Sequence, residues 1–431
     1  MSTVTLTGKS KSTENPVPLK GTIRVPASKS HSIRALLIAS LAEGSSRIRS
    51  PLYSEDSLSC LEACRTLGAR IEDRDDGWEI LSPIPRNQRG EVQINVGNSG
   101  TSLYLLTAIA ATLGSKVSFD GDEQIRSRSA ENLLNALKDL GATVTSSPRG
   151  CAPYSVQGPL TGGETSISCP TSQYLSALLL AAPLLPSNED EAVIRVPLLM
   201  EQPYAEMTLK WMKERGILWN QEGMKEFRIR GGQSYSPFDA PIAADFSSAT
   251  FFFCAAAISG SPLTLEGLDM NDSQGDKAVL SYLETMGCVI EHREEGIRIS
   301  PGNLSAAVLD LNDTPDALPA MAVTACYAEG ETRIVNVPQA RMKETDRIAV
   351  MTAELKKMGA DIEETPDGII IRGSALKGAS LHGHGDHRVV MALALASLGA
   401  LGDTVIDTAE SVNITYPGFF EQLKQLKEEA K

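Results

Sequence analysis

The feature that most constrains the fold of this chain is an internal repeat of about 72 residues. Five segments each combine an amphipathic helix, a glycine and the start of a strand, as in LLNALKDLGATV and MTAELKKMGADI. Glycine suits the left-handed position that closes a helix. A sixth helix, FFEQLKQLKEEA, ends the series without its strand. The glycines lie 73, 75, 71 and 72 residues apart, at Gly68, Gly141, Gly216, Gly287 and Gly359. Regular spacing of this kind predicts six copies of one structural unit.

A second series of six segments alternates with the first. These segments, such as SATFFFCAAAISG and HRVVMALALASLG, are rich in alanine and leucine and are apolar on nearly every face. Helices of that composition are buried all round. Each is followed by a run with strand character, such as KVSFDG or TRIVNV. Each unit therefore contains two helices, one buried and one amphipathic, together with several strands.

Six such units predict an α/β protein of two similar domains, each with three repeated units. The buried helices lie inside, and the sheets and amphipathic helices lie outside. A β/α barrel is excluded because its repeat is only about 30 residues long. If the N-terminal strand joins the C-terminal half, the chain crosses between domains near residues 24–27 and 240–244, which are extended and contain proline. We expect one lobe of residues 1–25 plus 243–431, and a second lobe of residues 26–242.

Charge and composition narrow the class of protein. A net charge of -14 argues against nucleic acid as the main partner. The longest apolar run, residues 174–185, is too short to span a membrane, and the polar N-terminus lacks the apolar core of a secretion signal. We therefore expect a cytoplasmic protein. Seven scattered cysteines indicate reduced thiols. Cys60 and Cys64 share a helix face, which indicates two packed thiols, with a metal pair as the alternative.

The starts of the buried helices carry polar residues. Hydroxyls and carboxylates there are ordinary caps. Lys29, Arg34 and Arg388 are different, because the helix dipole disfavours a cation at an N-terminus. Their presence indicates that an anion, a phosphate or a carboxylate, binds between them. The six starts are residues 27–34, 97–102, 170–173, 244–249, 314–318 and 384–388.

Further cations lie in the connecting segments, in GDEQIRSRS and in RMKETDR. Arginine suits bidentate recognition of phosphate and carboxylate, so the expected ligands are small and multiply anionic. A metal site is an alternative for the tract HGHGDHR, which contains His382, His384 and His387. The tract nevertheless has the pattern of a loop that leads into a helix cap. The sequence has no P-loop, no GxGxxG after a strand and no GxSxG elbow.

These motifs together resemble the enolpyruvyl transferases over nearly the whole chain. The resemblance is carried, in the family's order, by SKSHSIRA, GNSGT, GDEQIRSR, TSQYLSALLLAAPL, QPYAEMTL, DFSSATFF, PDALPAMA, RMKETDRI, GDHRVVMALAL and SVNITYPGFFEQL. It implies an inside-out α/β barrel in each domain, with the active site in the cleft between them. The implied reaction moves the enolpyruvyl group of phosphoenolpyruvate to the 5-hydroxyl of shikimate 3-phosphate and releases phosphate, in the shikimate pathway to aromatic amino acids.

The resemblance also implies a monomeric enzyme that needs nothing beyond its two substrates: no metal, no organic cofactor, no nucleic acid and no membrane. It assigns proton handling to Lys29, Asp316 and Glu344. The residues implied for shikimate 3-phosphate are Lys29, Ser30, Arg34, Thr171, Ser172, Gln173, Tyr204, Asp316, Gln339 and Lys343. Those implied for phosphoenolpyruvate are Lys29, Asn98, Gly100, Arg128, Gln173, Arg347 and Arg388.

Four positions depart from the family's pattern. Tyr104 stands where arginine is usual, and Ile414 where one subgroup has lysine. Gln339 replaces a common asparagine, and Glu201 a common serine near the substrate phosphate. A carboxylate beside a phosphate is repulsive unless it turns away. Two alternatives stay open: a related transferase acting on another phosphorylated cyclic polyol, and a non-catalytic anion-binding homologue. The relative that acts on UDP-N-acetylglucosamine is disfavoured, because its reactive-cysteine loop has no counterpart near residues 120–130.

Overall fold

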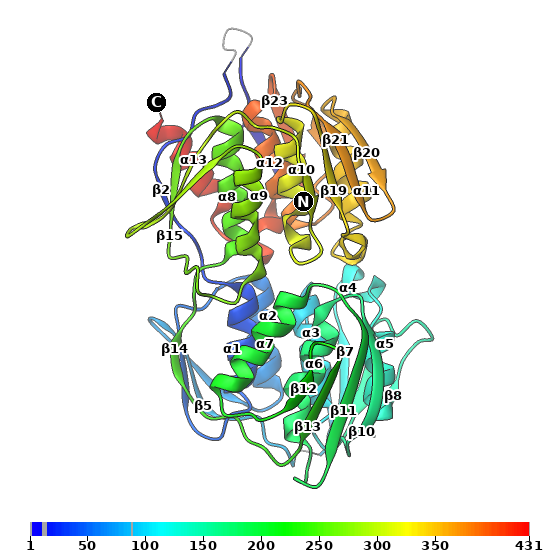
Figure 1. Cartoon of the computed structure of the whole chain (residues 1–431). Helices are drawn as coiled ribbons and strands as arrows, with labels where there is room; N and C mark the ends of the chain where they lie inside the picture. Colours follow the sequence, from blue (N-terminus) through cyan, green and yellow to red (C-terminus); the bar gives the residue numbers. More distant parts are fainter. Residues whose placement is uncertain (1, 11–14, 88, 431) are drawn as a thin grey trace. The chain divides into compact units, whose positions relative to one another are not determined.

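The computed structural model describes residues 2–10, 15–87 and 89–430. The chain divides into two compact units. We call Met1–Pro26 with Ala243–Lys431 the terminal unit, and Ala27–Ile242 the middle unit. Both are labelled by element in Figure 1. The chain passes between the units twice, after Pro26 and after Ile242.

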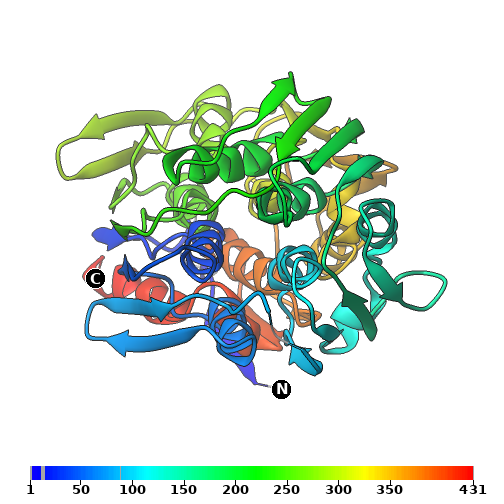
Figure 2. The ribbon, with the colours of Figure 1, turned by 90° about the horizontal axis from the view of Figure 1, so that it is seen from below.

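Three buried helices form the centre of the middle unit: α1 (Lys29–Ala39), α3 (Gly100–Ala110) and α6 (Ser172–Ala181). Every residue of α3 is buried, as its composition predicts. Figure 2 views α1 (blue) and α3 (light blue) nearly along their axes. Three sheets and further helices surround this centre. The helices are α2 (Glu55–Thr66), α4 (Glu123–Ser127), α5 (Glu131–Asp139), η1 (Ala182–Leu184) and α7 (Gln202–Glu214).

The three sheets of the middle unit each have four strands. The first, in spatial order, contains β14 (Asp239–Pro241), β3 (Ser46–Arg49), β5 (Gly77–Ser82) and β4 (Arg70–Arg74). The second contains β6 (Glu91–Asn95), β7 (Lys116–Asp120), β9 (Tyr154–Gln157) and β8 (Thr143–Thr145). The third contains β10 (Gly163–Cys169), β11 (Glu191–Leu199), β13 (Glu226–Arg230) and β12 (Asn220–Glu222).

The terminal unit repeats this plan. Its central helices are α8 (Phe246–Ser259), α10 (Leu318–Cys326) and α12 (His387–Gly399), and every residue of α8 and α12 is buried. The other helices are α9 (Val279–Thr285), α11 (Arg347–Lys357), α13 (Phe419–Glu429), η2 (Gly275–Ala278), η3 (Pro315–Ala317), η4 (Pro338–Met342) and η5 (Ala409–Ile414). One sheet contains β2 (Thr22–Arg24), β15 (Leu263–Glu266), β17 (Gly296–Ser300) and β16 (Val289–Arg293). Another contains β18 (Val308–Asp310), β19 (Glu331–Val335), β21 (Gly368–Arg372) and β20 (Asp361–Thr365).

Five sheets share one pattern, a parallel pair followed by two antiparallel pairings. In β6, β7, β9 and β8, for example, β6 and β7 run parallel, with the buried helix α3 in the connection between them. A parallel pair needs such a crossover, which is why the buried and the strand-forming segments alternate in the sequence. In the last sheet β22 (Ser380–Leu381) pairs parallel with β23 (Asp403–Asp407), and β1 (Thr3–Thr7) takes the place of the missing hairpin.

The five repeat glycines have the backbone conformation that the pattern predicts. Their φ angles lie between 84° and 106°, in the left-handed region, directly after the outer helices. The α/β fold class with six repeated units is therefore confirmed. All seven cysteines are free thiols, and six of them are buried. Among the helices of the described residues, not one has the length and apolar character needed to cross a membrane.

Candidate active site

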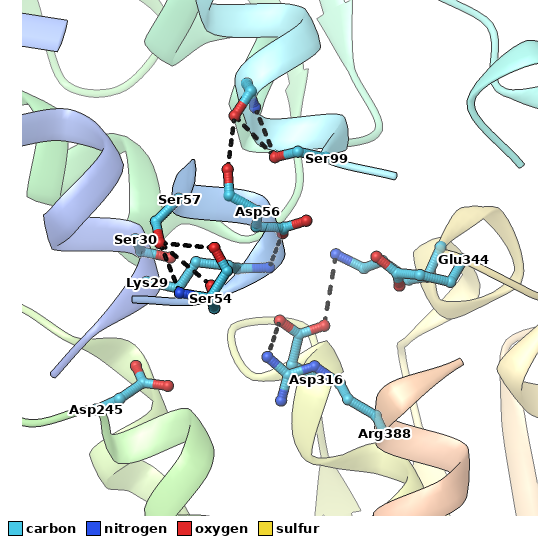
Figure 3. A network of polar contacts seen from close by, with 12 residues as sticks. Lys29, Ser30, Ser54, Asp56, Ser57, Ser99, Asp245, Asp316, Glu344 and Arg388 are labelled. Carbon is cyan, nitrogen blue, oxygen red and sulfur yellow. Dashed lines mark hydrogen bonds and ion pairs between the residues drawn. The ribbon is translucent and has the colours of Figure 1, made fainter. Parts of the chain in front are cut away.

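At the start of α1, Lys29 pairs with Asp56, a residue of the first turn of α2. Lys29 Nζ lies 3.0 Å from Asp56 Oδ2, and the two side chains are 14% and 4% exposed. Ser54 and Ser57 form a capping box that fixes this turn. Ser102 Oγ donates to the Asp56 carbonyl at 3.4 Å and so connects the starts of α2 and α3. The pair is drawn in Figure 3. A lysine is thereby held at a helix N-terminus by a neighbouring carboxylate.

Arg34 lies one turn further along α1 and is buried. Its guanidinium donates to the Ser30 carbonyl (3.1 Å), the Tyr204 carbonyl (3.0 Å) and the Thr208 hydroxyl (2.8 Å). Burial lowers the pKa of Arg34 to about 10, against a smaller opposing contribution from Tyr204. Three residues predicted to contact one substrate, Ser30, Arg34 and Tyr204, are therefore brought together. Arg34 connects them through their main chain.

The start of α3 faces the loop that carries Arg128. A Cβ atom at Gly100 would lie 2.6 Å from Arg128 Nη1, so a larger residue there would displace the guanidinium from this position. Asn98 Nδ2 donates to Gln124 Oε1 at 2.7 Å, which connects the same start to α4. Tyr104 is buried and donates to the Ser129 carbonyl at 3.3 Å. The tyrosine thus supports the segment next to Arg128 and supplies no positive charge.

The start of α6 presents two hydroxyls and an amide. Thr171 is the N-cap and accepts from the Gln173 N–H at 3.4 Å. Thr171 Oγ1 donates to Glu201 Oε2 at 3.2 Å, and Ser172 Oγ donates to the same oxygen at 3.4 Å. Gln173 Oε1 is buried and has no hydrogen-bond partner in the described part of the chain. A buried acceptor of this kind is costly unless something donates to it.

In the terminal unit, three carboxylates surround Arg347, the first residue of α11. The guanidinium is fully buried and donates to Asp316 Oδ1 (2.8 Å), to Glu344, and to both oxygens of Asp386 (2.8 and 3.1 Å). Burial alone would lower the pKa of Arg347, but the charges of the three carboxylates raise it above its usual value. Burial alone would raise the pKa of Asp386, yet the charge of Arg347 holds it below its usual value.

Two more cations reach Asp316. Arg388 Nη2 lies 3.1 Å from Asp316 Oδ2, and Lys343 Nζ lies 3.9 Å from Oδ1. Asp316 is drawn with Arg388 in Figure 3. Asp386 caps α12 by accepting from the Arg388 N–H at 2.9 Å. The starts of α10, α11 and α12 are therefore joined by a cluster of three carboxylates and three cations.

The remaining predicted positions of this unit lie around the cluster. Gln339 is buried in η4, where Nε2 donates to the Asn312 carbonyl at 2.9 Å. Its Oε1 is buried and lacks a hydrogen-bond partner among the described residues. Ile414 is a buried residue of η5. His382 Nδ1 lies 2.7 Å from Asp407, and His384 Nε2 lies 3.1 Å from Glu354. The histidine tract thus forms two histidine–carboxylate pairs that hold the loop before α12.

Sequence reasoning missed Asp56 and Asp386 as members of the site. Asp56 has the pattern of an ordinary acidic residue in a first helical turn, and nothing local shows that it faces Lys29. Asp386 stands in the HGDHR helix start, beside Arg388, and that position was the available signal. Its contact with Arg347, 39 residues away, depends on the packing of α11 against α12.

Comparison with known proteins agrees with this architecture. Residues 13–423 match the family described as EPSP synthase (3-phosphoshikimate 1-carboxyvinyltransferase). The 3-phosphoshikimate 1-carboxyvinyltransferase of Acetivibrio thermocellus is 52% identical over 94% of this chain and 95% of its own. That of Methanocaldococcus jannaschii is 40% identical over 95% of this chain and 96% of its own. A solved structure of EPSP synthase from Acinetobacter baumannii superposes with a TM-score of 0.79, at 28% identity, covering 98% of both chains.

The repeated α/β units, with charged groups at the starts of their buried helices, define the class as an enolpyruvyl transferase. More narrowly, the chain belongs to the EPSP synthase family.

Proposed function

We propose that this protein transfers the enolpyruvyl group of phosphoenolpyruvate to the 5-hydroxyl of shikimate 3-phosphate, giving 5-enolpyruvylshikimate 3-phosphate and phosphate. Family membership over nearly the whole chain supports the reaction. The observation that supports the assignment of residues is the cluster around Arg347, because carboxylates, which can exchange protons, lie there next to cations suited to an anionic substrate.

The reaction has two stages that each move protons. The 5-hydroxyl adds to C2 of phosphoenolpyruvate, loses its proton, and C3 gains one. The tetrahedral adduct then expels phosphate, and C3 loses a proton to restore the double bond. Atoms and charges balance with the two substrates alone. Lys29 and Glu344 exchange protons at C3 and at the leaving phosphate oxygen, and Asp316 takes the proton of the hydroxyl.

In the proposal, Glu344 and the substrate carboxylate compete for the guanidinium of Arg347. Its donors are engaged by Asp316, Glu344 and Asp386. When the carboxylate of phosphoenolpyruvate binds, it replaces Glu344 on the guanidinium, and Glu344 becomes available for proton transfer. Asp386 stays in place as the buried carboxylate that orients Arg347. Arg128, Arg388, Asn98 and Gly100 complete the phosphoenolpyruvate contacts in the proposal.

Shikimate 3-phosphate is held by hydroxyl, amide and cationic groups. Its phosphate binds at Ser30, Thr171 and Ser172, and Lys343 adds a positive charge. The buried Oε1 atoms of Gln173 and Gln339 accept hydrogen bonds from bound substrate, which satisfies both acceptors. Arg34 acts on Ser30 and Tyr204 through their carbonyls.

The test is direct. Purified protein given both substrates should release phosphate and form the enolpyruvyl product, detected by mass. Lys29→Met and Glu344→Ala should each stay folded and lose at least about 100-fold in rate, the usual contribution of one acid–base group. Lys116→Met and Glu91→Ala, which change an exposed ion pair, are the matched controls. Turnover only with another polyol phosphate would assign a different substrate to the protein. No turnover with any polyol phosphate would indicate an anion-binding homologue without catalytic activity.

The proposal also includes a monomeric enzyme located in the cytoplasm. Light scattering on the purified protein measures the first property, and fractionation of the source cells measures the second.

A further inference from the structure

Glu201 is a buried carboxylate in a strained position. The residue is only 1% exposed, and its backbone is left-handed, with φ 58° and ψ 41°. A residue other than glycine is strained in that conformation. Glu201 is the N-cap of α7, yet its side chain makes no capping hydrogen bond to that helix. The strained backbone and the burial of Glu201 are therefore not explained by a capping hydrogen bond to α7.

The carboxylate turns instead to the start of the neighbouring helix α6. Glu201 Oε2 accepts from Thr171 Oγ1 at 3.2 Å and from Ser172 Oγ at 3.4 Å. Ser172 is fully buried, and both hydroxyls stand at the positive end of the α6 dipole. Glu201 thus acts as an internal anion at the place where an external anion would be bound.

A hydroxyl has one proton to donate. While Thr171 and Ser172 donate to Glu201, neither can donate to a phosphate oxygen. A phosphate that approaches them also meets the negative charge of Glu201, and like charges at short range repel each other. Competition and repulsion both act on the phosphate group alone.

We propose that Glu201 is a specificity-determining residue that sets the affinity for the phosphate of the substrate by competing for the Thr171 and Ser172 hydroxyls. The inference rests on the proposed function, in which these hydroxyls contact the phosphate of shikimate 3-phosphate. Glu201 weakens the binding of the phosphorylated substrate and leaves the binding of unphosphorylated shikimate unchanged. It therefore reduces the preference of the enzyme for the phosphate ester over the free alcohol.

The experiment compares Glu201→Gln with Glu206→Gln by calorimetric titration. At position 201 the substitution keeps the shape and one acceptor oxygen of the side chain while it removes the charge. Glu206 lies on the same helix, is exposed and accepts from Gln202 Nε2 at 2.7 Å, so its variant makes the same change in net charge away from α6. Glu201→Gln should bind shikimate 3-phosphate about tenfold more tightly than Glu206→Gln, with equal Kd for shikimate and equal KM for phosphoenolpyruvate. Glu201→Ser, which also removes the charge, should behave in the same way.

A purely structural role gives a different result. If Glu201 only joins α6 to α7, Glu201→Gln lowers Tm and leaves the Kd for shikimate 3-phosphate equal to that of Glu206→Gln or weaker, which overturns the inference. Phosphate release by the unaltered protein is measured in parallel. Turnover without a shift in Kd removes the role of Glu201 alone, whereas absence of turnover and of binding removes the proposed function and this inference together.

Discussion

At the scale of single residues, the buried charges of the terminal unit are stable only as a set. Arg347 and Asp386 are both fully buried, and each would carry a large desolvation cost alone. Removing one member of such a pair typically costs about 3–5 kcal/mol. The exposed pair between Arg49 and Asp239 has the same chemistry in water, where it contributes about 0–1 kcal/mol.

Asp386→Asn should therefore lower the free energy of unfolding by about 3 kcal/mol at neutral pH, and Asp239→Asn by less than about 1 kcal/mol. The pKa of Asp386 is lowered in the folded state, so its contribution is present above its usual value of 3.8 and is lost as the pH falls through the lowered pKa. Urea unfolding at several pH values should show the difference between wild type and Asp386→Asn shrinking in acid. A difference that grows in acid would contradict the assignment.

Lys29 and Asp56 should be energetically coupled. Lys29→Met leaves the Asp56 carboxylate buried beside an apolar chain, whereas the double variant with Asp56→Asn removes both charges. A double-mutant cycle on unfolding free energies should give a coupling of about 0.5–3 kcal/mol. The same cycle on the exposed pair Lys116 and Glu91 should give about 0–1 kcal/mol. Equal couplings in the two cycles would mean that burial of the Lys29 pair has no energetic effect.

Single residues were predictable where a local rule identified them. Lys29 and Arg388 stand out because a cation at a helix start is unfavourable unless an anion is near. Asp56, the partner of Lys29, and Asp386, the partner of Arg347, did not stand out, because both are ordinary acidic residues at helix starts. The orientation of Glu201 could not be predicted either. Its position indicated repulsion from a phosphate, but its hydrogen bonds to Thr171 and Ser172 depend on the packing of α6 against α7.

At the scale of helices and strands, the repeat made the fold predictable. A glycine with a fixed role marks the end of each outer helix, and the composition of the buried helices identifies them. The structure differs in detail after Gly216, where the next strand, β12, starts only at Asn220. Ile217 is buried and Leu218 is 77% exposed, but neither belongs to a strand, because regular pairing begins only with Asn220 opposite Arg228.

The repeat glycines allow a matched test of conformational strain. Gly359 and Gly287 have φ angles of 89° and 106°. A Cβ at Gly359 meets no atom within 4 Å, whereas one at Gly287 lies 2.6 Å from the Asn303 carbonyl oxygen. Gly359→Ala should therefore cost only the conformational strain, about 1–2 kcal/mol. Gly287→Ala should cost more, because the backbone of Asn303 must also move. Chemical denaturation of both variants measures the difference, and equal losses would show that the clash is relieved without cost.

At the scale of the whole molecule, strand pairing joins segments of each unit that are distant in the sequence. In the middle unit β14, from the end of the unit, pairs with β3, and in the terminal unit β2, from the N-terminal segment, pairs with β15. The N-terminal strand β1 completes the last sheet by pairing with β23. The terminal unit therefore needs the first residues of the chain as much as the last.

The two crossings between units also lead to a prediction about ligand binding. The proposed catalytic groups are divided, with Lys29 in the middle unit and Asp316 and Glu344 in the terminal unit. Proton transfer needs all of them within hydrogen-bond reach of one substrate pair. The chain crosses between the units twice, so the proposal predicts that the units change their relative position when substrates bind. Small-angle scattering should show a smaller radius of gyration with shikimate 3-phosphate and a phosphoenolpyruvate analogue than without them. Lys29→Met, which lacks a charge that is proposed to bind both ligands, should compact less, and a radius unchanged by ligands in the wild type would exclude closure as part of the mechanism.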